Sequence, residues 1–293
     1  MTDTIASWRT DVGYKIPGVD TTECDAAVLK AALDFCSYTK IWTERLFPMD
    51  IVVIEAAGDI VFNDAAPATI TSDGALGTDF STYFAAGDII VTNHQSAEDD
   101  EKDNTGPYLI ATAGVAAATL TLATGEVVVA DTDVSSIYIS KAVYALTSSN
   151  GDIVEATHVK LDGKVLDPKG EAWLDENIEN WRIAMGSPEF FTVDREKKLR
   201  LIPVPNELIY HGLEVWVSLK PIRAATTFPD FIFDDWFEAI SDGAVAELLS
   251  QTSKPWRDFE AAGFYWGRYA SRREDARTRA RLGHSEARSR MTA

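Results

Sequence analysis

The strongest constraint on the fold is a change in composition between the middle of the chain and its two ends. Residues 56–140 are rich in Thr, Ala, Val, Gly and Asp and contain a single Lys or Arg. Short alternating or apolar runs separated by turn residues recur there, a pattern typical of β-strands. We expect strands at residues 59–62, 68–71, 87–92, 108–113, 119–123, 127–130 and 136–140.

These strands predict a small all-β module, a compact barrel or sandwich, over residues 57–139. Both flanks of the module carry helical patterns. We therefore expect an α+β protein: a helical body with a small antiparallel β-sheet, an inserted all-β module and a long C-terminal helical arm. The body would comprise residues 1–56 plus 140–254, and the C-terminal helix and arm residues 255–293.

A helix is predicted over residues 21–47, where apolar side chains recur at helical spacing. Thr22 and Asp25 resemble a capping box at its start, and Phe47-Pro48 ends it. Another helix is expected from Asp234 or Asp235, which can cap it. The last helix is expected from Pro255 to about Leu282, with Gly283 just beyond its end.

The segment between the module and the last two helices predicts mixed structure. Leu213, Val215, Val217 and Leu219 alternate on one face of a strand. Residues 194–197 are polar and predict a hairpin turn. The expected strands are 142–147, 158–161, 189–193, 198–204 and 212–220, and the expected helical segments lie around 152–156 and within 170–185.

Charge is distributed unequally along the chain. Residues 268–293 hold eight arginines and three acids, a net charge of +5, whereas the preceding 267 residues hold 19 basic and 43 acidic residues, a net charge of −24. An acidic body argues against specific binding of nucleic acid, because phosphate neutralisation needs clustered Lys and Arg. An acidic body is consistent with the lining of a channel through which DNA passes without binding. It is equally consistent with a charge that only keeps the protein soluble.

Catalytic and metal-binding signatures are missing from the sequence, so we expect no enzyme, no catalytic residue, no cofactor and no metal site. The four histidines have no paired spacing, and Cys24 and Cys36 are too far apart along one helix for a disulfide. The acidic run 98–104 faintly resembles a calcium loop, but Asn104 and Ile110 stand where glycine and a carboxylate are needed. We see no signal peptide and no membrane span.

The C-terminal helix carries the clearest candidate site. Its arginines recur every four residues, and such a face is expected to project from the domain rather than cover an apolar core. A solvated tail, nucleic acid and an acidic protein surface are the alternatives, and docking to protein is favoured. The candidate partner-binding residues are Arg268, Arg272, Arg273, Arg277, Arg279, Arg281, Arg288 and Arg290.

Aromatic residues cluster just before these arginines. At helical spacing they predict packing, but a helix with bulky residues all round is either buried or shared with a partner. The cluster therefore also raises the expectation of oligomerisation. The candidate anchor or packing residues are Trp256, Phe259, Phe264, Tyr265, Trp266 and Tyr269.

Three segments together resemble bacteriophage head–tail adaptor proteins, the portal-bound connectors of the phage neck. They are the helix after Asp20-Thr21-Thr22-Glu23; Leu199-Arg-Leu-Ile-Pro-Val-Pro-Asn with the strand that begins at Leu213; and the stretch from Phe228-Pro-Asp through Lys254-Pro-Trp to the arginine-rich helix. The inserted module departs from the simplest adaptors. Its runs around residues 84–91, 106–113 and 118–122 resemble a β-module of phage tail proteins.

The resemblance implies a virion protein, made in the host cytoplasm, that forms a ring at the head–tail interface, commonly of twelve copies. Its C-terminal arm, here residues 268–290, would reach into the portal protein. Its other face would receive a stopper or tail protein, and genomic DNA would pass through the acidic channel without specific binding. A baseplate or fibre-attachment protein, and a carbohydrate-active enzyme whose β-module binds glycan, are the alternatives.

Overall fold

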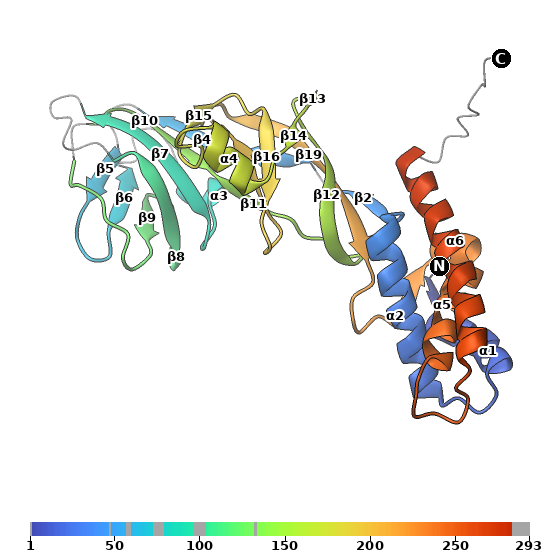
Figure 1. The fold of residues 1–293 in the computed structure, drawn as a ribbon. Coiled ribbons are helices and arrows are strands. Elements are labelled where there is room, and N and C mark those ends of the chain that lie inside the picture. Colours follow the sequence, from blue (N-terminus) through green and yellow to red (C-terminus); the bar gives the residue numbers. More distant parts are fainter. Residues whose placement is uncertain are drawn as a thin grey trace, which may run out of the picture. The chain divides into compact units, whose positions relative to one another are not determined.

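The chain folds into two compact units of different character. The structure, a computed structural model, describes residues 2–46, 48–56, 60–72, 79–96, 104–131 and 134–282. The helical unit comprises Met1–Glu44, Ser148–Glu155 and Val217–Ala293, and the β unit comprises Arg45–Thr147 and Ala156–Trp216. Long helices and antiparallel sheets coexist in the described residues (Figure 1), which confirms the predicted α+β class and the C-terminal helix.

The predicted division into body, inserted module and arm stays a prediction about independent folding. The two compact units do not follow the predicted boundaries, because residues 57–139 belong to the same unit as most of the strands that follow them in the chain. The division falls within two strands, β12 (Asp152–Leu161) and β19 (Ile209–Lys220). Residues 156–161 and 209–216 belong to the β unit, and residues 152–155 and 217–220 belong to the helical unit.

The helical unit is built around α5. Helices α2 and α5 pack against each other, and α1 and α6 each pack against both of them. The antiparallel pair of β1 and β20 precedes α1 and α5 along the chain. The bounds are β1 Thr2–Thr4, α1 Ile5–Lys15, α2 Thr21–Thr39, β20 Thr227–Pro229, α5 Asp230–Leu249 and α6 Phe259–Leu282.

Aromatic side chains fill the space between α1 and α5. Trp8 is fully buried and contacts the rings of Phe228, Phe233 and Phe237 at centroid distances of 5.1–5.3 Å. Its indole N–H donates to the carbonyl oxygen of Phe237 at 3.1 Å, so the only polar atom of the side chain is satisfied. This contact fixes α1, which the sequence analysis did not predict, to α5.

Helix α2 is shorter than predicted. It ends at Thr39 because Lys40 adopts the left-handed conformation (φ 56°) and its N–H caps the carbonyl of Cys36. Residues 43–45 then form strand β2, Thr43–Arg45, instead of continuing the helix. At its other end the side chain of Asp20 accepts from the Thr22 N–H, so Asp20 is the N-cap in place of the predicted Thr22.

The first part of the β unit is a seven-stranded sheet in the order β4-β10-β7-β8-β9-β6-β5. The described strand pairs in it are antiparallel, and β5 at one edge approaches β10 near the other, so the sheet curls around one core (Figure 1). The bounds are β4 Val53–Ala56, β5 Ile60–Asn63, β6 Thr69–Ser72, α3 Phe80–Tyr83, β7 Ile89–Ser96, β8 Gly106–Ala116, β9 Thr119–Leu122 and β10 Val134–Lys141.

Alternation explains why these strands form. In β5, β6, β9 and the first five residues of β8 every second residue is buried, and most of the buried residues meet in one cluster that includes Ile60, Phe62, Ile70, Ile110 and Leu120. Six of the seven predicted strands are confirmed. The predicted strand at 127–130 is wrong, because these residues leave the sheet.

The remaining strands form smaller sheets. One sheet has four strands in the order β11-β17-β16-β14. A second has the order β13-β12-β19-β2, and β3 also pairs with β19. In the third, β15 pairs with β18. The bounds are β3 Met49–Ile51, β11 Val143–Ala145, β12 Asp152–Leu161, β13 Lys164–Val165, β14 Asp167–Pro168, α4 Glu171–Asn177, β15 Met185–Gly186, β16 Phe190–Val193, β17 Lys198–Ile202, β18 Val204–Pro205 and β19 Ile209–Lys220.

Several local predictions in this region can be compared directly. The hairpin turn at 194–197 is confirmed, because β16 and β17 pair antiparallel across it. The alternating residues of β19, Leu213 to Leu219, are all buried as predicted. The helical segment predicted around 152–156 is wrong: it is the start of β12, where pairing with neighbouring strands outweighs local preference.

Candidate functional site

Helix α6 carries the predicted site and is anchored by its own start. It begins at Phe259, later than the predicted Pro255, because the Asp258 carboxylate accepts from the N–H groups of Glu260 and Ala261 at 3.1 and 3.0 Å. Every seventh residue (Ala262, Tyr269, Ala276) is buried, which turns one face toward α5 and α2.

The closest approach of α6 to α5 is at Gly243. A Cβ added there would lie 2.9 Å from the ring of Tyr269 and 3.1 Å from the Cβ of Ala31. Helices α2, α5 and α6 therefore meet at Gly243. Any larger side chain at this position would force the neighbouring helices or side chains to move.

Arg268 and Arg272 meet a buried carboxylate of α5. Arg272 donates to Asp242 Oδ2 at 3.0 Å, the Arg268 Nε lies 3.2 Å from the same oxygen, and Lys15 Nζ lies 3.6 Å from Oδ1. The Asp242 side chain is completely buried. Burial raises the pKa of this carboxyl, and the charges of Arg268, Lys15 and Arg272 oppose that rise. Arg272 also pairs with Glu238.

Arg273 and Arg277 meet α2 on the other side of the helix. Arg273 donates to Asp34 at 2.6 Å, and its guanidinium lies 4.1 Å from the centre of the Tyr38 ring. Arg277 donates to the Tyr38 hydroxyl at 2.9 Å. The Tyr269 hydroxyl donates to Asp34 at 2.8 Å, and burial, together with that hydrogen bond, raises the pKa of Tyr269.

The expectation that the arginine face projects from the domain is therefore wrong for residues 268–277. The arginines form two rows along the helix: Arg268 and Arg272 meet a carboxylate of α5, and Arg273 and Arg277 meet Asp34 and Tyr38 of α2. The sequence offered one signal that was missed. Asp242 follows Ser241 in a stretch of α5, residues 239–246, whose other residues are apolar or glycine, and a charge in such a stretch is rare unless it is paired.

The last arginines are placed differently. Arg279 is exposed and stacks over the Trp236 ring at 5.1 Å, and Arg281 is exposed with no ion pair to any described residue. Arg288 and Arg290, like Gly283, lie outside the described residues. Among the described arginines of α6, the one with the fewest intramolecular contacts, Arg281, thus lies at the end of the helix.

The predicted aromatic residues divide into buried and exposed groups. Tyr269 is buried at the junction of three helices, and Trp256 and Tyr265 are half-buried. Phe259, Phe264 and Trp266 are 56, 62 and 51 % exposed. Large exposed rings on a single helix are a feature of interaction surfaces.

The other sequence candidates lie in the β unit. Of the acidic run 98–104 only Asn104 is described; its side chain bonds the backbone of Val129 in both directions, at 2.7 and 2.8 Å. Asn104 N–H also donates to His94 Nδ1, and His94 Nε2 lies 3.2 Å from Asp131 Oδ2, all within the buried core. His94 and Asp131 are far apart in sequence, and no spacing pattern identified the pair.

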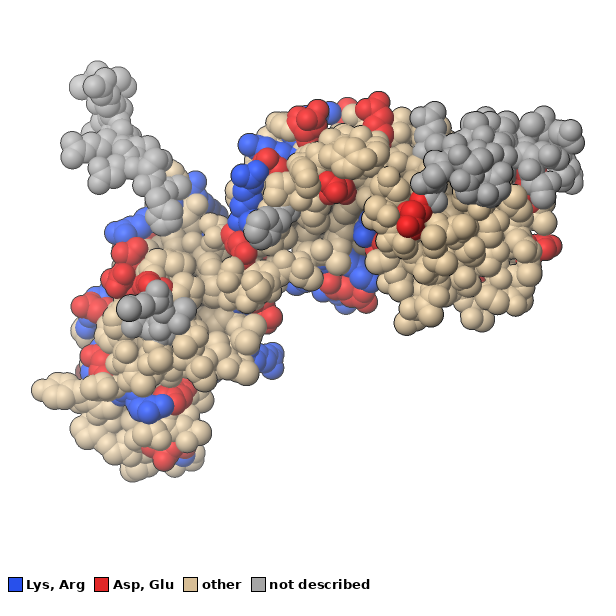
Figure 2. All heavy atoms as spheres, turned by 180° about the vertical axis from the view of Figure 1, so that it is seen from behind, with Lys and Arg blue, Asp and Glu red and all other residues tan. Residues whose placement is uncertain are grey.

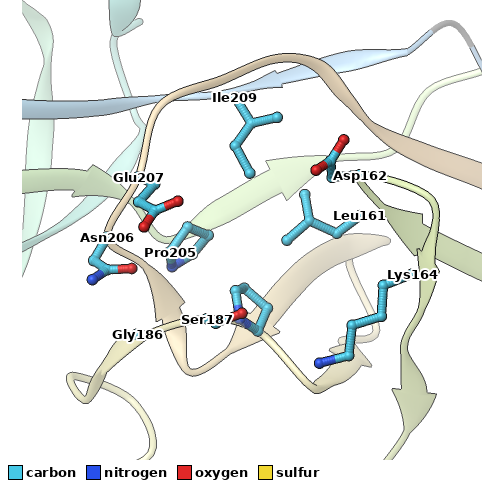
Figure 3. A pocket seen from close by; sticks show the side chains of 10 residues that line it. Leu161, Asp162, Lys164, Gly186, Ser187, Pro205, Asn206, Glu207 and Ile209 are labelled. Atoms are coloured by element: carbon cyan, nitrogen blue, oxygen red, sulfur yellow. The ribbon is translucent and has the colours of Figure 1, made fainter.

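A pocket of about 230 Å³ lies between β13, β15, β18 and the start of β19. Figure 3 shows the carboxylates of Asp162 and Glu207 on separate sides of it, with Leu161 and Pro205 between them. Paired carboxylates for acid–base work would have to converge on one point, and these two do not.

Among the described residues, no group of three or more His, Cys, Asp or Glu side chains is arranged to hold a metal ion. No helix in the described ranges is long and apolar enough to cross a membrane.

A model of the SU10 adaptor protein family matches residues 90–291, which is more than half of the chain and includes α5 and α6. A comparison with curated proteins finds no match.

Proposed function

Because the chain belongs to the SU10 adaptor protein family, and is thereby a bacteriophage structural adaptor, we propose that it is a subunit of the ring that docks beneath the portal and links it to the tail. The observation that carries the proposal is the family match, which extends through the arginine-rich end of the chain. The protein would act at the neck of the virion by binding proteins, without catalysis.

The contacts of the arginines refine where the portal would bind. Arg268, Arg272, Arg273 and Arg277 hold α6 to its own unit and are positioning residues for the helix. Portal docking is proposed for the end of α6 and the segment after it, which carry Arg279, Arg281, Arg288 and Arg290. Arginine suits this role because its planar group binds carboxylates in a fixed geometry.

The charge of the rest of the chain supports a channel that DNA crosses without binding. The residues before 268 carry a net charge of −24. Figure 2 shows basic and acidic side chains interspersed over the visible face of the helical unit, so that no extended basic surface is formed there. A surface of this kind does not bind DNA phosphates, because it lacks a cluster of Lys and Arg side chains and the net charge is negative. The proposed assembly is therefore a ring of this chain, the portal protein, a downstream tail or stopper protein, and passing DNA.

Truncation tests the docking site. Removing residues 283–293 leaves α6 and the ion pairs described above intact, so the melting temperature of the helical unit should be unchanged. We expect the truncated chain, especially with Arg279→Ala and Arg281→Ala, to lose co-sedimentation with its cognate portal protein. Arg257→Ala removes an exposed arginine of the same unit and should have no effect. Unchanged portal binding by the truncated double variant would contradict the proposal.

A further inference from the structure

The helical unit presents two exposed helix faces whose shapes are complementary. On α6, Gly263 and Gly267 lie on the outer face, and a Cβ added to either would meet nothing within 4 Å. At about 100° per residue, Phe264 borders one edge of these glycines, and Phe259 and Trp266 border the other. All three rings are more than half exposed. We call this surface, a glycine strip between exposed rings, the α6 slot.

The outer face of α1 has the opposite shape. Ala6, Thr10 and Tyr14 follow one another at intervals of four residues and are all exposed, with Tyr14 at 87 % the most exposed large hydrophobic side chain among the described residues. Such a row forms a ridge along the helix, and ridges of this spacing pack into the grooves of a second helix. We call this row the α1 ridge.

The two surfaces lie on opposite sides of the unit. α1 contacts α5 through the rings of Phe233 and Phe237, and α6 contacts α5 through Asp242 and Gly243. These two pairs lie about 150° apart around the axis of α5. The α1 ridge and the α6 slot each point away from the core, so one copy cannot bring its own ridge to its own slot.

We infer that the α1 ridge of one copy docks into the α6 slot of the next, so that copies of this chain associate head to tail. Contacts between different surfaces on opposite sides of a subunit generate rings when the rotation closes. This would be the contact between neighbouring subunits of the proposed adaptor ring. That the copies close into a ring, and do not form an open filament, rests on the proposed function.

Charge complementarity supports a second copy as the occupant. Glu260 and Asp275 on the exposed side of α6 form no ion pair with any described residue. Arg223, which lines a groove with Ile5, Ala6 and Arg9 of α1, is exposed and likewise forms no ion pair within the described ranges. Docking would bring Arg223 of one copy toward Glu260 and Asp275 of the next, so that charges without an ion pair in the single chain would face opposite charges.

The available area predicts a weak contact between two copies. An aromatic side chain contributes about 150–250 Å² when fully exposed, so the exposed parts of Tyr14, Phe259, Phe264 and Trp266 amount to roughly 400–600 Å². A stable pairwise interface buries about 1,600 Å². Single contacts should therefore form and dissociate rapidly, and covalent capture is the appropriate assay.

Cross-linking of the full chain tests the inference. Thr10→Cys places a thiol on the ridge and Ser271→Cys places one at the edge of the slot, and both leave Tyr14 and the glycines in place. The natural Cys24 and Cys36 are buried and should not react. With a bismaleimide, an equimolar mixture of the two variants is expected to form dimers at least fivefold faster than either variant alone, and a chain with both substitutions should form a ladder of higher species.

Filling the slot provides the matched control. Gly263→Leu with Gly267→Leu, introduced beside Ser271→Cys, should abolish the cross-link to Thr10→Cys while raising the melting temperature of the helical unit, because leucine favours a helix more than glycine does. Cross-linking that persists in the filled-slot variant would overturn the inference, as would equal cross-linking of either single variant with itself. The assay contains no portal protein, so a negative result here and a negative result in the truncation experiment reject different statements.

Discussion

Replacing Asp242 by Asn tests whether the arginines of α6 are held by the protein itself. The carboxylate of Asp242 is fully buried and is shared by Lys15, Arg268 and Arg272. Asn keeps the shape of the side chain but removes its charge, which leaves three cations around one buried position. We expect a loss of stability with no change in the fold.

The magnitude follows from the burial of the partners. Removing one member of a buried ion pair typically costs about 3–5 kcal/mol, because the remaining charge is left without compensation. The three cations here are partly exposed and can turn toward water. We therefore expect a smaller cost than this, about 2–3 kcal/mol in the free energy of unfolding. Urea unfolding followed by far-UV circular dichroism, which reports on the helices, measures it.

Glu238→Gln is the matched control. Glu238 pairs with Arg272 in the same cluster, but its side chain is 68 % exposed. Surface ion pairs contribute about 0–1 kcal/mol, so this variant should lose less than about 0.5 kcal/mol. An equally small loss for Asp242→Asn would refute the reasoning, since it would mean that burial already keeps Asp242 protonated and that the arginines are not held by its charge.

Three further predictions concern packing and reactivity. Gly243→Ala should destabilise the helical unit by about 1 kcal/mol in thermal unfolding, because overlap with Tyr269 outweighs the gain in helix propensity; a more stable variant would contradict it. Burial raises the pKa of Cys24 to about 11 and of Cys36 to about 12, so neither thiol should react with iodoacetamide at about pH 8 until urea unfolds the chain; alkylation of the folded protein, seen by mass spectrometry, would contradict this. Asn104→Ala should lower the melting temperature of the β unit, because two buried hydrogen bonds to the backbone are lost; an unchanged melting curve would show that water replaces them.

The sequence predicted those elements whose pattern is set by local alternation. Strands β5, β6, β8 and β9 were found because every second residue faces one core, and β19 was found for the same reason. Helix α1 was overlooked although Ile5, Trp8 and Val12 recur at helical spacing. The end of α2 could not be placed, because a left-handed lysine, rather than glycine or proline, ends it.

The candidate site shows the limit of reading charge from sequence. Spacing located the arginines in rows along a helix, but the surface that each row meets depends on how helices distant in sequence pack together. Asp34 and Asp242 come from α2 and α5, and they reach α6 through tertiary packing alone. Sequence patterns report which residues share a face, whereas the partner of that face is decided by the fold.

The position of this chain in the particle tests the proposal that it joins the portal to the tail at the neck of the virion. Gly125 lies in a turn of the β unit with a positive φ and open space around it, so a short peptide tag inserted there should leave the fold intact. Imaging of purified particles with a label on that tag should show density between the capsid and the tail. Density at the distal end of the tail would contradict the account and favour a baseplate or fibre-attachment protein.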